Sequence, residues 1–500
     1  MRGPAVTPRA EQVVVVGGGI AGLTAAFRLS QAGVDVTVVE PDRLGGKLQT
    51  SVVAGRPVDE SADAFLLRVP WALALCHDLE IDGELISPAA RNAQVFVDDA
   101  RWPLPDGHVL GIPTDLEALA RSGVVSAAAV DRVAADLRLA ADPSDPGVSG
   151  ADVAIGPYLR RRLGDEVVDH LIDPLVGGIN AGDTAMLSLA AVVPQLDAAA
   201  RSGDPSLIRS CLAQREQATT PAGAPVFATP IGGMARIVDA LLALMPGVDL
   251  RVGRRVVDIE LSGSPGRPSM GRARTGRTSR GRASRGRTAR VTLDDGSVLD
   301  TGAVVVACPA HVAASLLAGP APGAAAPLGA IEHASISMVT LAFDQGAVRA
   351  DLEASGCLIP RDQGTLVTAM SFATSKWAQL RDPDRHDVLL RVSAGRYGDD
   401  RHLDLDDADL TDRILADLDR VLGLDAGPSE VRVGRWPRSF PQYAPGHLDR
   451  MDAVEAGLAD GPIVLAGAAL RGVGVPACIR SGEEAAARLG ATWPTRRSVT

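Results

Sequence analysis

The sequence predicts an α/β fold in which one domain is assembled from separated segments of the chain. An apolar run at residues 13–16 leads into the glycine-rich stretch GGGIAG and then into TAAFRLSQAG, which has helical spacing and a final glycine. The following run, VDVTVVE, is rich in β-branched residues, so these segments together predict a βαβ unit. Further strands are expected within 248–261, 290–293, 303–307 and 463–467.

The length of the chain predicts more than one folding unit, because 500 residues exceed what a single hydrophobic core usually supports. We expect the segments 13–60, 225–310 and 430–490 to form a discontinuous α/β domain. The segments 61–224 and 311–429 are expected to form an interleaved mixed-sheet domain and a helical domain.

The segment 262–290 differs in composition from the rest of the chain. It is rich in Gly, Ser, Thr and Arg and lacks the apolar periodicity that a core needs, which predicts a disordered insertion. A basic arm that docks an anionic partner is the alternative. The arginines of this segment also mask the acidity of the remainder, whose net charge is more negative than the −11 of the whole chain. So acidic a body is unsuited to binding nucleic acid.

The five cysteines are scattered and show no C-x-x-C spacing, which argues against a disulfide framework and against a zinc site. No apolar stretch reaches the length of about 18 residues that a transmembrane helix needs, and the N-terminus lacks the apolar region of a secretory signal. We therefore expect a cytoplasmic protein that holds no metal.

Gly17, Gly19 and Gly22 stand in the G-x-G-x-x-G spacing between the first predicted strand and the first predicted helix. In this context the first glycine permits a tight turn, the second lets the backbone approach a pyrophosphate, and the third lets helix and strand pack closely. Glu40 ends the second strand, where an acidic side chain can bind ribose hydroxyls. The pattern predicts a Rossmann-like domain that binds an ADP-containing dinucleotide, and these residues alone suit NAD as well as FAD.

A second glycine turn, DRLGGKLQT, follows the predicted ribose contact and contains Arg43, Gly45, Gly46 and Lys47. It resembles the R-x-G-G-[KR] element of the amine-oxidase-like flavoproteins, in which this element lies along the pyrophosphate of FAD. The resemblance implies that the cofactor is FAD.

Two distant segments extend this resemblance. Val256 stands where that superfamily reads adenine with a backbone amide and carbonyl. The stretch LAGAALRGVGVPACIRSGEEAA resembles its closing flavin motif, in which Gly467 ends a strand and a short turn opens a helix under the isoalloxazine and ribityl chain. The residues of this turn are Gly472, Val473, Gly474 and Val475. A helix N-terminus there can stabilise negative charge on the reduced flavin.

Within that superfamily the sequence is similar to the porphyrinogen oxidases of haem synthesis. The similarity lies in DPLVGGINAGDTAMLSLAAVVPQL, FATPIGGMARIVDALL, WPRSFPQYAPGH and RGVGVPACIRSGEEAA. It implies the six-electron oxidation of a porphyrinogen by flavin N5 and dioxygen, with release of hydrogen peroxide and without a catalytic side chain. Coproporphyrinogen III is the expected substrate and protoporphyrinogen IX the alternative. The resemblance also allows a transient contact with a ferrochelatase.

The same resemblance suggests where the substrate binds. It puts a backbone carbonyl of Gly182 against the pyrrole N–H groups. Mitochondrial-type members have a propionate-binding arginine at the position of Ala93, so the nearby Arg91 and Arg101 become the candidates for that contact.

An amine oxidase on the same fold is the first competing interpretation. Such enzymes usually trap the amine between two aromatic rings and place a lysine near flavin N5. This chain has three tyrosines, and its second lysine, Lys376, lies in an unrelated SKW segment. A carotenoid-type desaturase and a flavin-bearing scaffold without turnover are further alternatives.

Overall fold

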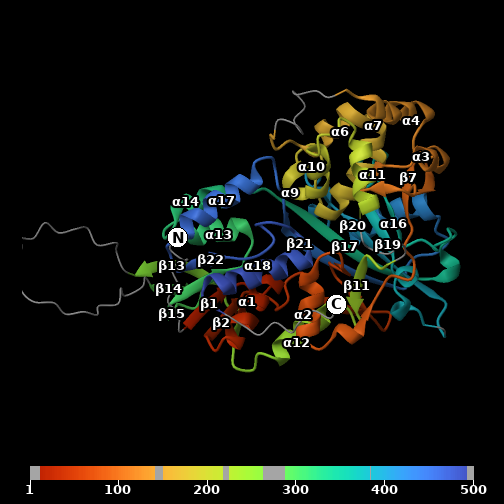
Figure 1. Ribbon diagram of the computed structural model, residues 1–500. Coiled ribbons are helices and arrows are strands. Elements are labelled where there is room, and N and C mark those ends of the chain that lie inside the picture. Colours follow the sequence, from red (N-terminus) through yellow and green to blue (C-terminus); the bar gives the residue numbers. More distant parts are fainter. Residues whose placement is uncertain (1–11, 141–149, 218–223, 263–287, 383, 492–500) are drawn as a thin grey trace, which may run out of the picture.

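The computed structural model describes residues 12–140, 150–217, 224–262, 288–382 and 384–491, which form the predicted α/β fold. Its first layer is a five-stranded parallel sheet with the strand order β12-β2-β1-β16-β22 (Figure 1). The strands are β1 (Gln12–Val16), β2 (Asp35–Glu40), β12 (Asp249–Val252), β16 (Ala303–Val306) and β22 (Ile463–Leu465). They come from all three segments that we expected to form the discontinuous domain.

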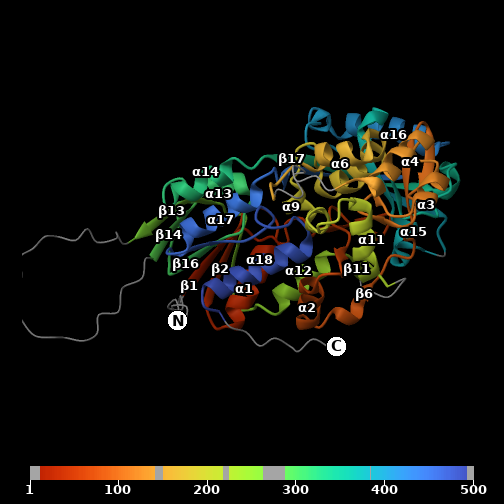
Figure 2. The same ribbon diagram turned by 45° about the horizontal axis from the view of Figure 1, so that its top comes forward.

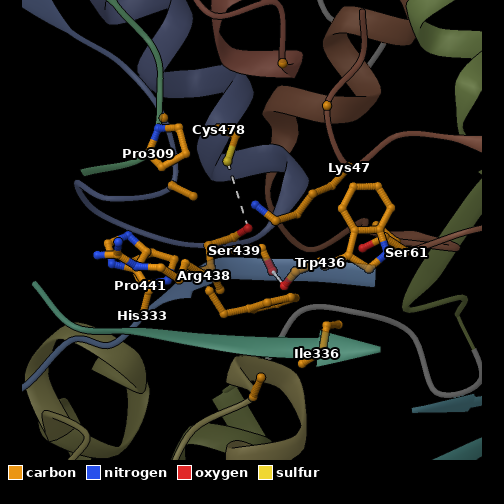
Figure 3. Close-up of a pocket in the computed structure, with 18 of the residues that line it drawn as sticks. Lys47, Ser61, Pro309, His333, Ile336, Trp436, Arg438, Ser439, Pro441 and Cys478 are labelled. Carbon is orange, nitrogen blue, oxygen red and sulfur yellow. Dashed lines mark hydrogen bonds between the residues drawn. The ribbon is translucent and has the colours of Figure 1, made fainter. Parts of the chain in front are cut away.

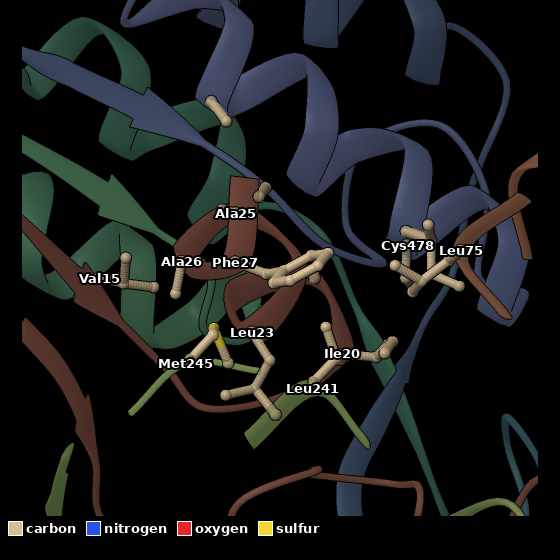
Figure 4. Close-up of a cluster of buried hydrophobic side chains, with 14 of the residues drawn as sticks. Val15, Ile20, Leu23, Ala25, Ala26, Phe27, Leu75, Leu241, Met245 and Cys478 are labelled. Atoms are coloured by element: carbon tan, nitrogen blue, oxygen red, sulfur yellow. The ribbon is translucent and has the colours of Figure 1, made fainter. Parts of the chain in front are cut away.

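Helices cover both faces of this sheet, as its apolar central strands require. The four valines that end β1 are almost completely buried, because side chains on both faces of a parallel strand meet protein. The core on one face includes side chains of α1 (Ile20–Gln31), α2 (Pro70–Asp78), α12 (Ala235–Ala243) and α18 (Val475–Arg488) (Figure 4). The core on the other face includes α13 (Ala310–Leu317), α14 (Pro322–Gly329) and α17 (His447–Leu458).

A three-stranded antiparallel sheet lies between β12 and β16 in the chain. Its strands are β13 (Val256–Ser262), β14 (Thr288–Leu293) and β15 (Val298–Thr301). The strand signal at 248–261 is thus divided between two sheets, because the chain turns at Gly253, whose φ is 73°. Ser262 at the end of β13 pairs with Thr288 of β14, so the prediction of disorder is wrong for residue 262 and for residues 288–290. The rest of the predicted insertion, 263–287, lies outside the described residues.

The second large sheet is mixed and has seven strands in the order β21-β17-β20-β19-β18-β7-β8. Its neighbouring strands run antiparallel except for β18 and β7, which are parallel. The strands are β7 (Ala93–Val97), β8 (Ala100–Pro103), β17 (His333–Asp344), β18 (Gly356–Leu358), β19 (Val367–Phe372), β20 (Asp387–Ala394) and β21 (Glu430–Pro441). We expected residues 430–441 in the discontinuous domain, whereas β21 pairs with β17, so the chain returns to that domain only after Pro441.

Helices pack on this sheet and beside it (Figures 1 and 2). Helix α16 (Asp407–Leu422) shares a core with β17, β19 and β20. A helical portion with its own core consists of α3 (Leu116–Ser122), α4 (Ala127–Ala134), α6 (Ile155–Leu163), α7 (Asp165–Val167), α8 (Gly178–Asn180), α9 (Leu189–Val192), α10 (Pro194–Ala200) and α11 (Leu207–Gln217). Between α7 and α8 the chain forms a π-helix, η3 (Val168–Gly177), which contains Pro174.

Short elements complete the structure. They are β3 (Thr50–Val53), β4 (Arg56–Asp59), β5 (Phe65–Leu66), β6 (Leu85–Ile86), β9 (His108–Val109), β10 (Ile112–Pro113), β11 (Phe227–Pro230) and α15 (Ala373–Lys376), with several 3₁₀ turns. In the part of the chain that the structure describes, no helix is both long and apolar enough to cross a membrane.

Candidate active site

A cavity of about 930 Å³ begins at the carboxyl ends of the parallel strands and continues to the seven-stranded sheet. Its first part is lined by the residues that follow β1, β2, β16 and β22, and its second part by residues of η3, β17, β19, β20 and β21. Figure 3 shows Lys47 and Ile336 on opposite walls of this space. Ligands of open parallel sheets bind outside the carboxyl ends of the strands, so the first part is the expected place for a dinucleotide.

The three glycines of the first turn have different surroundings. Gly17 has a φ of 108°, and a Cβ there would lie 2.7 Å from the carbonyl oxygen of Ala307. A Cβ at Gly22 would lie 2.0 Å from the carbonyl oxygen of Gly17, so this glycine lets α1 approach the turn. A Cβ at Gly19 would meet no protein atom within 4 Å, and Gly19 lines the cavity. The space above Gly19 is therefore available to a ligand.

Glu40 lies at the end of β2 with its carboxylate held by two backbone amides. One oxygen accepts a hydrogen bond from the amide of Gly18 at 2.7 Å, and the other accepts one from the amide of Asp42 at 2.9 Å. Each oxygen retains a lone pair for a further donor, because a carboxylate accepts about four hydrogen bonds. The side chain is thus oriented to bind hydroxyl groups at the edge of the cavity.

The second glycine turn packs directly on the first. The amide of Gly45 donates to the carbonyl oxygen of Gly18 at 2.7 Å. The turn brings Lys47 into the cavity, where its ammonium lies 5.6 Å from the ring centroid of Phe440. Burial lowers the pKa of Lys47 from its ordinary value. Arg43 also lines the cavity, and its guanidinium lies 3.4 Å from the Glu60 carboxylate.

The C-terminal motif closes the same part of the cavity. Gly467 follows β22 with a φ of 116°, and Gly472 has a φ of 137° and donates its amide to the hydroxyl of Tyr443 at 2.9 Å. Helix α18 then begins at Val475, so its N-terminus faces the cavity. All of the predicted cofactor residues except Gly22 and Gly472 line this one space, namely Gly17, Gly19, Glu40, Arg43, Gly45, Gly46, Lys47, Val256, Gly467, Val473, Gly474 and Val475.

Gly182 lines the second part of the cavity, but its carbonyl oxygen already has a partner in the protein. Arg361 donates to that oxygen, to a carboxylate oxygen of Asp173 at 3.1 Å and to the carbonyl oxygen of Tyr397 at 3.2 Å. A Cβ at Gly182 would lie 2.6 Å from Leu187, so the close packing here also requires glycine. The contact of Gly182 with pyrrole N–H groups stays a prediction.

Neither Arg91 nor Arg101 lines the cavity. Arg101 donates to the side-chain oxygen of Gln94 at 3.2 Å and to the carbonyl oxygen of Asp351 at 2.8 Å, which holds it at the far edge of the seven-stranded sheet. Arg91 is exposed before β7. Their role as propionate ligands stays a prediction.

The cavity is also lined by three arginines and two histidines that the sequence did not single out. They are Arg255, Arg396 and Arg438, and His311 and His333. The rings of these histidines lie edge to face at 5.0 Å, and burial lowers the pKa of His333 to about 4. Both the histidine pair and the arginines come from segments that are distant in sequence, so no local spacing could have revealed them.

Two histidines outside the cavity, His447 and His170, make structural contacts with backbone carbonyl groups. His447 is fully buried, stacks on Tyr443 at 3.9 Å, and its Nε2 lies 2.8 Å from the carbonyl oxygen of Leu470. Burial lowers the pKa of His447 to about 4, so the ring is neutral at pH 7. Nδ1 of His170 lies 3.0 Å from the carbonyl oxygen of Val124.

All five cysteines are free thiols, and none is exposed. Burial raises the pKa of every one, to about 11 for Cys478 and to about 12 for Cys76, Cys211, Cys308 and Cys357. Cys308 and Cys478 line the cavity. Among the described residues no group of three or more His, Cys, Asp or Glu side chains could hold a metal ion.

Lys376 and the three tyrosines, which were weighed for an amine oxidase, lie outside the lining of the cavity. Lys376 forms an ion pair with Asp63 at 2.8 Å and does not line the cavity. None of the three tyrosines lines it either: Tyr443 donates to the carbonyl oxygen of Ala468, and Tyr397 donates to Glu332.

Fold and cavity together describe a flavin-dependent oxidoreductase. The sequence profile of the flavin-containing amine oxidoreductase family matches residues 20–490, so the chain belongs to this family and its cofactor is FAD. A coproporphyrinogen III oxidase of Bacillus subtilis is 31% identical over 494 residues, covering 95% of this chain and 97% of the relative. The protein of the same name from Mycobacterium bovis is 35% identical over 479 residues, covering 95% and 96%. A crystal structure from Exiguobacterium sp. 255-15, provisionally named a protoporphyrinogen oxidase, is 27% identical and has a TM-score of 0.80 over 97% of this chain and 99% of that chain.

The residues of the first part of the cavity fit FAD. Gly19 leaves open space at the N-terminus of α1, where backbone amides favour a pyrophosphate. Glu40 has lone pairs that could accept hydrogen bonds from ribose hydroxyls, and Arg43 and Lys47 line the same space, where they would lie beside the phosphates. The N-terminus of α18 would direct its positive dipole toward the flavin.

Proposed function

We propose that this protein oxidises coproporphyrinogen III to coproporphyrin III in haem biosynthesis, with dioxygen as electron acceptor and hydrogen peroxide as by-product. The observation that carries the proposal is the match to coproporphyrinogen III oxidases over nearly the full length of both chains. One continuous cavity that joins the FAD residues to a wide second part is consistent with a macrocyclic substrate.

The protein's part in this reaction is to bind and orient. The glycine turns at Gly17–Gly19 and Gly45–Gly46, with Glu40, would hold FAD, which would supply a two-electron acceptor for hydride from the methylene bridges of the macrocycle. The wall of the second part offers apolar side chains for the macrocycle, among them Ile336, Met338 and Ile359. No described side chain in that wall is placed as a nucleophile with its base, and aromatisation of the product supplies the driving force. We place the reaction in the cytoplasm, with a transient contact to a ferrochelatase that receives the product.

Protoporphyrinogen IX is the second candidate substrate. The observation in its favour is the likeness to the Exiguobacterium structure, whose provisional name specifies that activity. The two substrates differ in the number of carboxylates, four against two, so the cations of the cavity wall are the features that can discriminate between them.

The test is anaerobic reduction of the bound FAD by each porphyrinogen, followed as the loss of flavin absorbance in a stopped-flow instrument. We expect coproporphyrinogen III to reduce the flavin faster than protoporphyrinogen IX, and admission of air to restore the oxidised spectrum with formation of peroxide. Faster reduction by protoporphyrinogen IX would reverse the substrate assignment, and reduction by neither would refute the proposed function. Benzylamine and putrescine serve as controls for amine oxidation.

A further inference from the structure

Arg396 lies in the wall of the second part of the cavity, just after β20. It is only 9% exposed and lines the cavity, yet its guanidinium forms no hydrogen bond and no ion pair with any residue that the structure describes. The turn that carries it depends on Gly395, whose φ is 90° and where a Cβ would lie 2.2 Å from the ring of His402. A tightly packed turn therefore delivers an unpartnered cation to the cavity.

Positive charges outnumber negative charges around Arg396. Two other arginines and two carboxylates lie near it, and each carboxylate has its own arginine. Arg361 pairs with Asp173 at 3.1 Å, and Arg401 pairs with Asp399 at 2.7 Å. Three guanidinium groups thus face two carboxylates, and Arg396 is the one without a counter-ion.

Burial and the charge of Arg361 lower the pKa of Arg396 to about 10, so Arg396 remains positively charged at pH 7. A buried charge without a partner is costly to the folded protein. An anionic group of a ligand would offset that cost, and a guanidinium binds a carboxylate through two parallel hydrogen bonds.

The surroundings of Arg396 suit the edge of a large apolar ligand. Thr368 and Ser393 line the same cavity, and their hydroxyls lie 2.8 Å from each other. Ile336 and Met338 of β17 form an apolar surface of the same cavity. A macrocycle can therefore lie on the apolar surface while a carboxylate at its rim meets the guanidinium and the hydroxyls.

We propose that Arg396 binds a carboxylate of the substrate, with the hydroxyls of Thr368 and Ser393 beside it. The inference rests on the proposed function, because it identifies the ligand as a porphyrinogen. It assigns the carboxylate contact to the end of β20, whereas the sequence alone pointed to Arg91 and Arg101.

The experiment compares Arg396→Met, Arg396→Gln and Arg396→Lys with the wild type, all loaded with FAD. Steady-state kinetics with coproporphyrinogen III give kcat and KM, and quenching of porphyrin fluorescence gives the Kd of the product, coproporphyrin III. Arg349→Met is the matched control, because Arg349 is 58% exposed and pairs with Asp425 at the surface. Arg101→Met tests the earlier candidate.

We expect Arg396→Met and Arg396→Gln to raise both KM and Kd by about ten- to a hundredfold with little change in kcat, as loss of a charged hydrogen bond predicts. Arg396→Lys should recover most of the loss, and Arg349→Met should behave as the wild type. If Met at this position prevents FAD loading, the Gln variant decides the comparison.

Two results would overturn the inference. One is a KM and a Kd within twofold of the wild type in the FAD-loaded Arg396 variants, and the other is a larger effect of Arg101→Met. A wild type that binds coproporphyrin III but does not oxidise coproporphyrinogen III would refute the proposed function alone, because the Kd values would still report on Arg396.

Discussion

Replacing Gly19 by valine should remove FAD from the protein while leaving the polypeptide folded. The backbone at Gly19 has φ −71° and ψ 174°, an extended conformation that any residue adopts, and no protein atom lies within 4 Å of a Cβ there. The change should therefore cost the apoprotein no more than about 1 kcal/mol, the range for an unfavourable residue at a helix N-cap. The valine methyl groups would occupy the space that the pyrophosphate needs.

Gly22→Ala is the matched comparison, because it should destabilise the polypeptide itself. The new Cβ would lie 2.0 Å from the carbonyl oxygen of Gly17, so α1 must shift by about 1 Å. Such overpacking costs about 1–3 kcal/mol, which lowers a melting temperature by roughly 2–4 °C for each kcal/mol. Gly22→Ala should thus melt several degrees lower even without FAD.

The assay is the ratio of flavin to protein absorbance in the purified variants, together with melting curves of each apoprotein with and without added FAD. Wild-type apoprotein should be stabilised by FAD, because a ligand that binds only the native state raises its stability. Gly19→Val should melt within about 4 °C of the wild-type apoprotein and show no stabilisation by FAD. A Gly19→Val protein with the wild-type flavin content would refute the assignment of this space to the pyrophosphate.

Three further predictions follow from the site and its surroundings. His447 has a pKa of about 4 in the folded protein and an ordinary pKa of about 6.5 in the unfolded chain, so below pH 6.5 the ring takes up a proton on unfolding. The contribution of the neutral ring to stability is therefore complete above pH 6.5 and is lost as the pH falls toward 4. The change in the free energy of unfolding is up to about 3 kcal/mol. His447→Gln should flatten the fall in melting temperature between pH 7 and 4.5, and an unchanged slope would contradict this. Replacing residues 263–287 by Asn-Gly would join the paired residues Ser262 and Thr288 through a two-residue hairpin turn. Flavin content, melting temperature and turnover should change little. A tenfold loss of turnover would show that the segment takes part in catalysis. Lys47→Met should weaken FAD binding by about ten- to a hundredfold, and Lys47→Arg should weaken it much less. The measurement is a titration of each apoprotein with FAD. If Lys47→Met binds FAD as tightly as Lys47→Arg, a charge contact between residue 47 and the cofactor is excluded.

Many residues that line the first part of the cavity could be predicted because they lie close together in the sequence. The spacing of Gly17, Gly19 and Gly22 encodes a turn, and Glu40 follows at the end of the next strand, so neighbours in sequence become neighbours at one edge of the sheet. The C-terminal turn at Gly472 was found only by resemblance, since nothing in a single sequence relates it to Gly17.

The second part of the cavity is formed by strands that pair although they are far apart in the sequence. β21 joins the seven-stranded sheet because it pairs with the long strand β17, and its own residues do not reveal that partner. The family resemblance suggested that Arg101 lies near the substrate, but its guanidinium donates a hydrogen bond to the carbonyl oxygen of Asp351. Arg396 is one of many arginines in the sequence, and only the structure shows that it is buried in the cavity wall without a counter-ion.

The burial of the five thiols bears on how long such an enzyme can work. Hydrogen peroxide attacks the thiolate form of cysteine, and an ordinary thiol is a few per cent thiolate at pH 7. With pKa values of about 11 to 12, these cysteines carry about one thiolate in ten thousand molecules or fewer. Cys308 and Cys478 border the very cavity in which we propose that peroxide forms. On the proposed function, the protonated state of these two thiols would slow their oxidation by that peroxide.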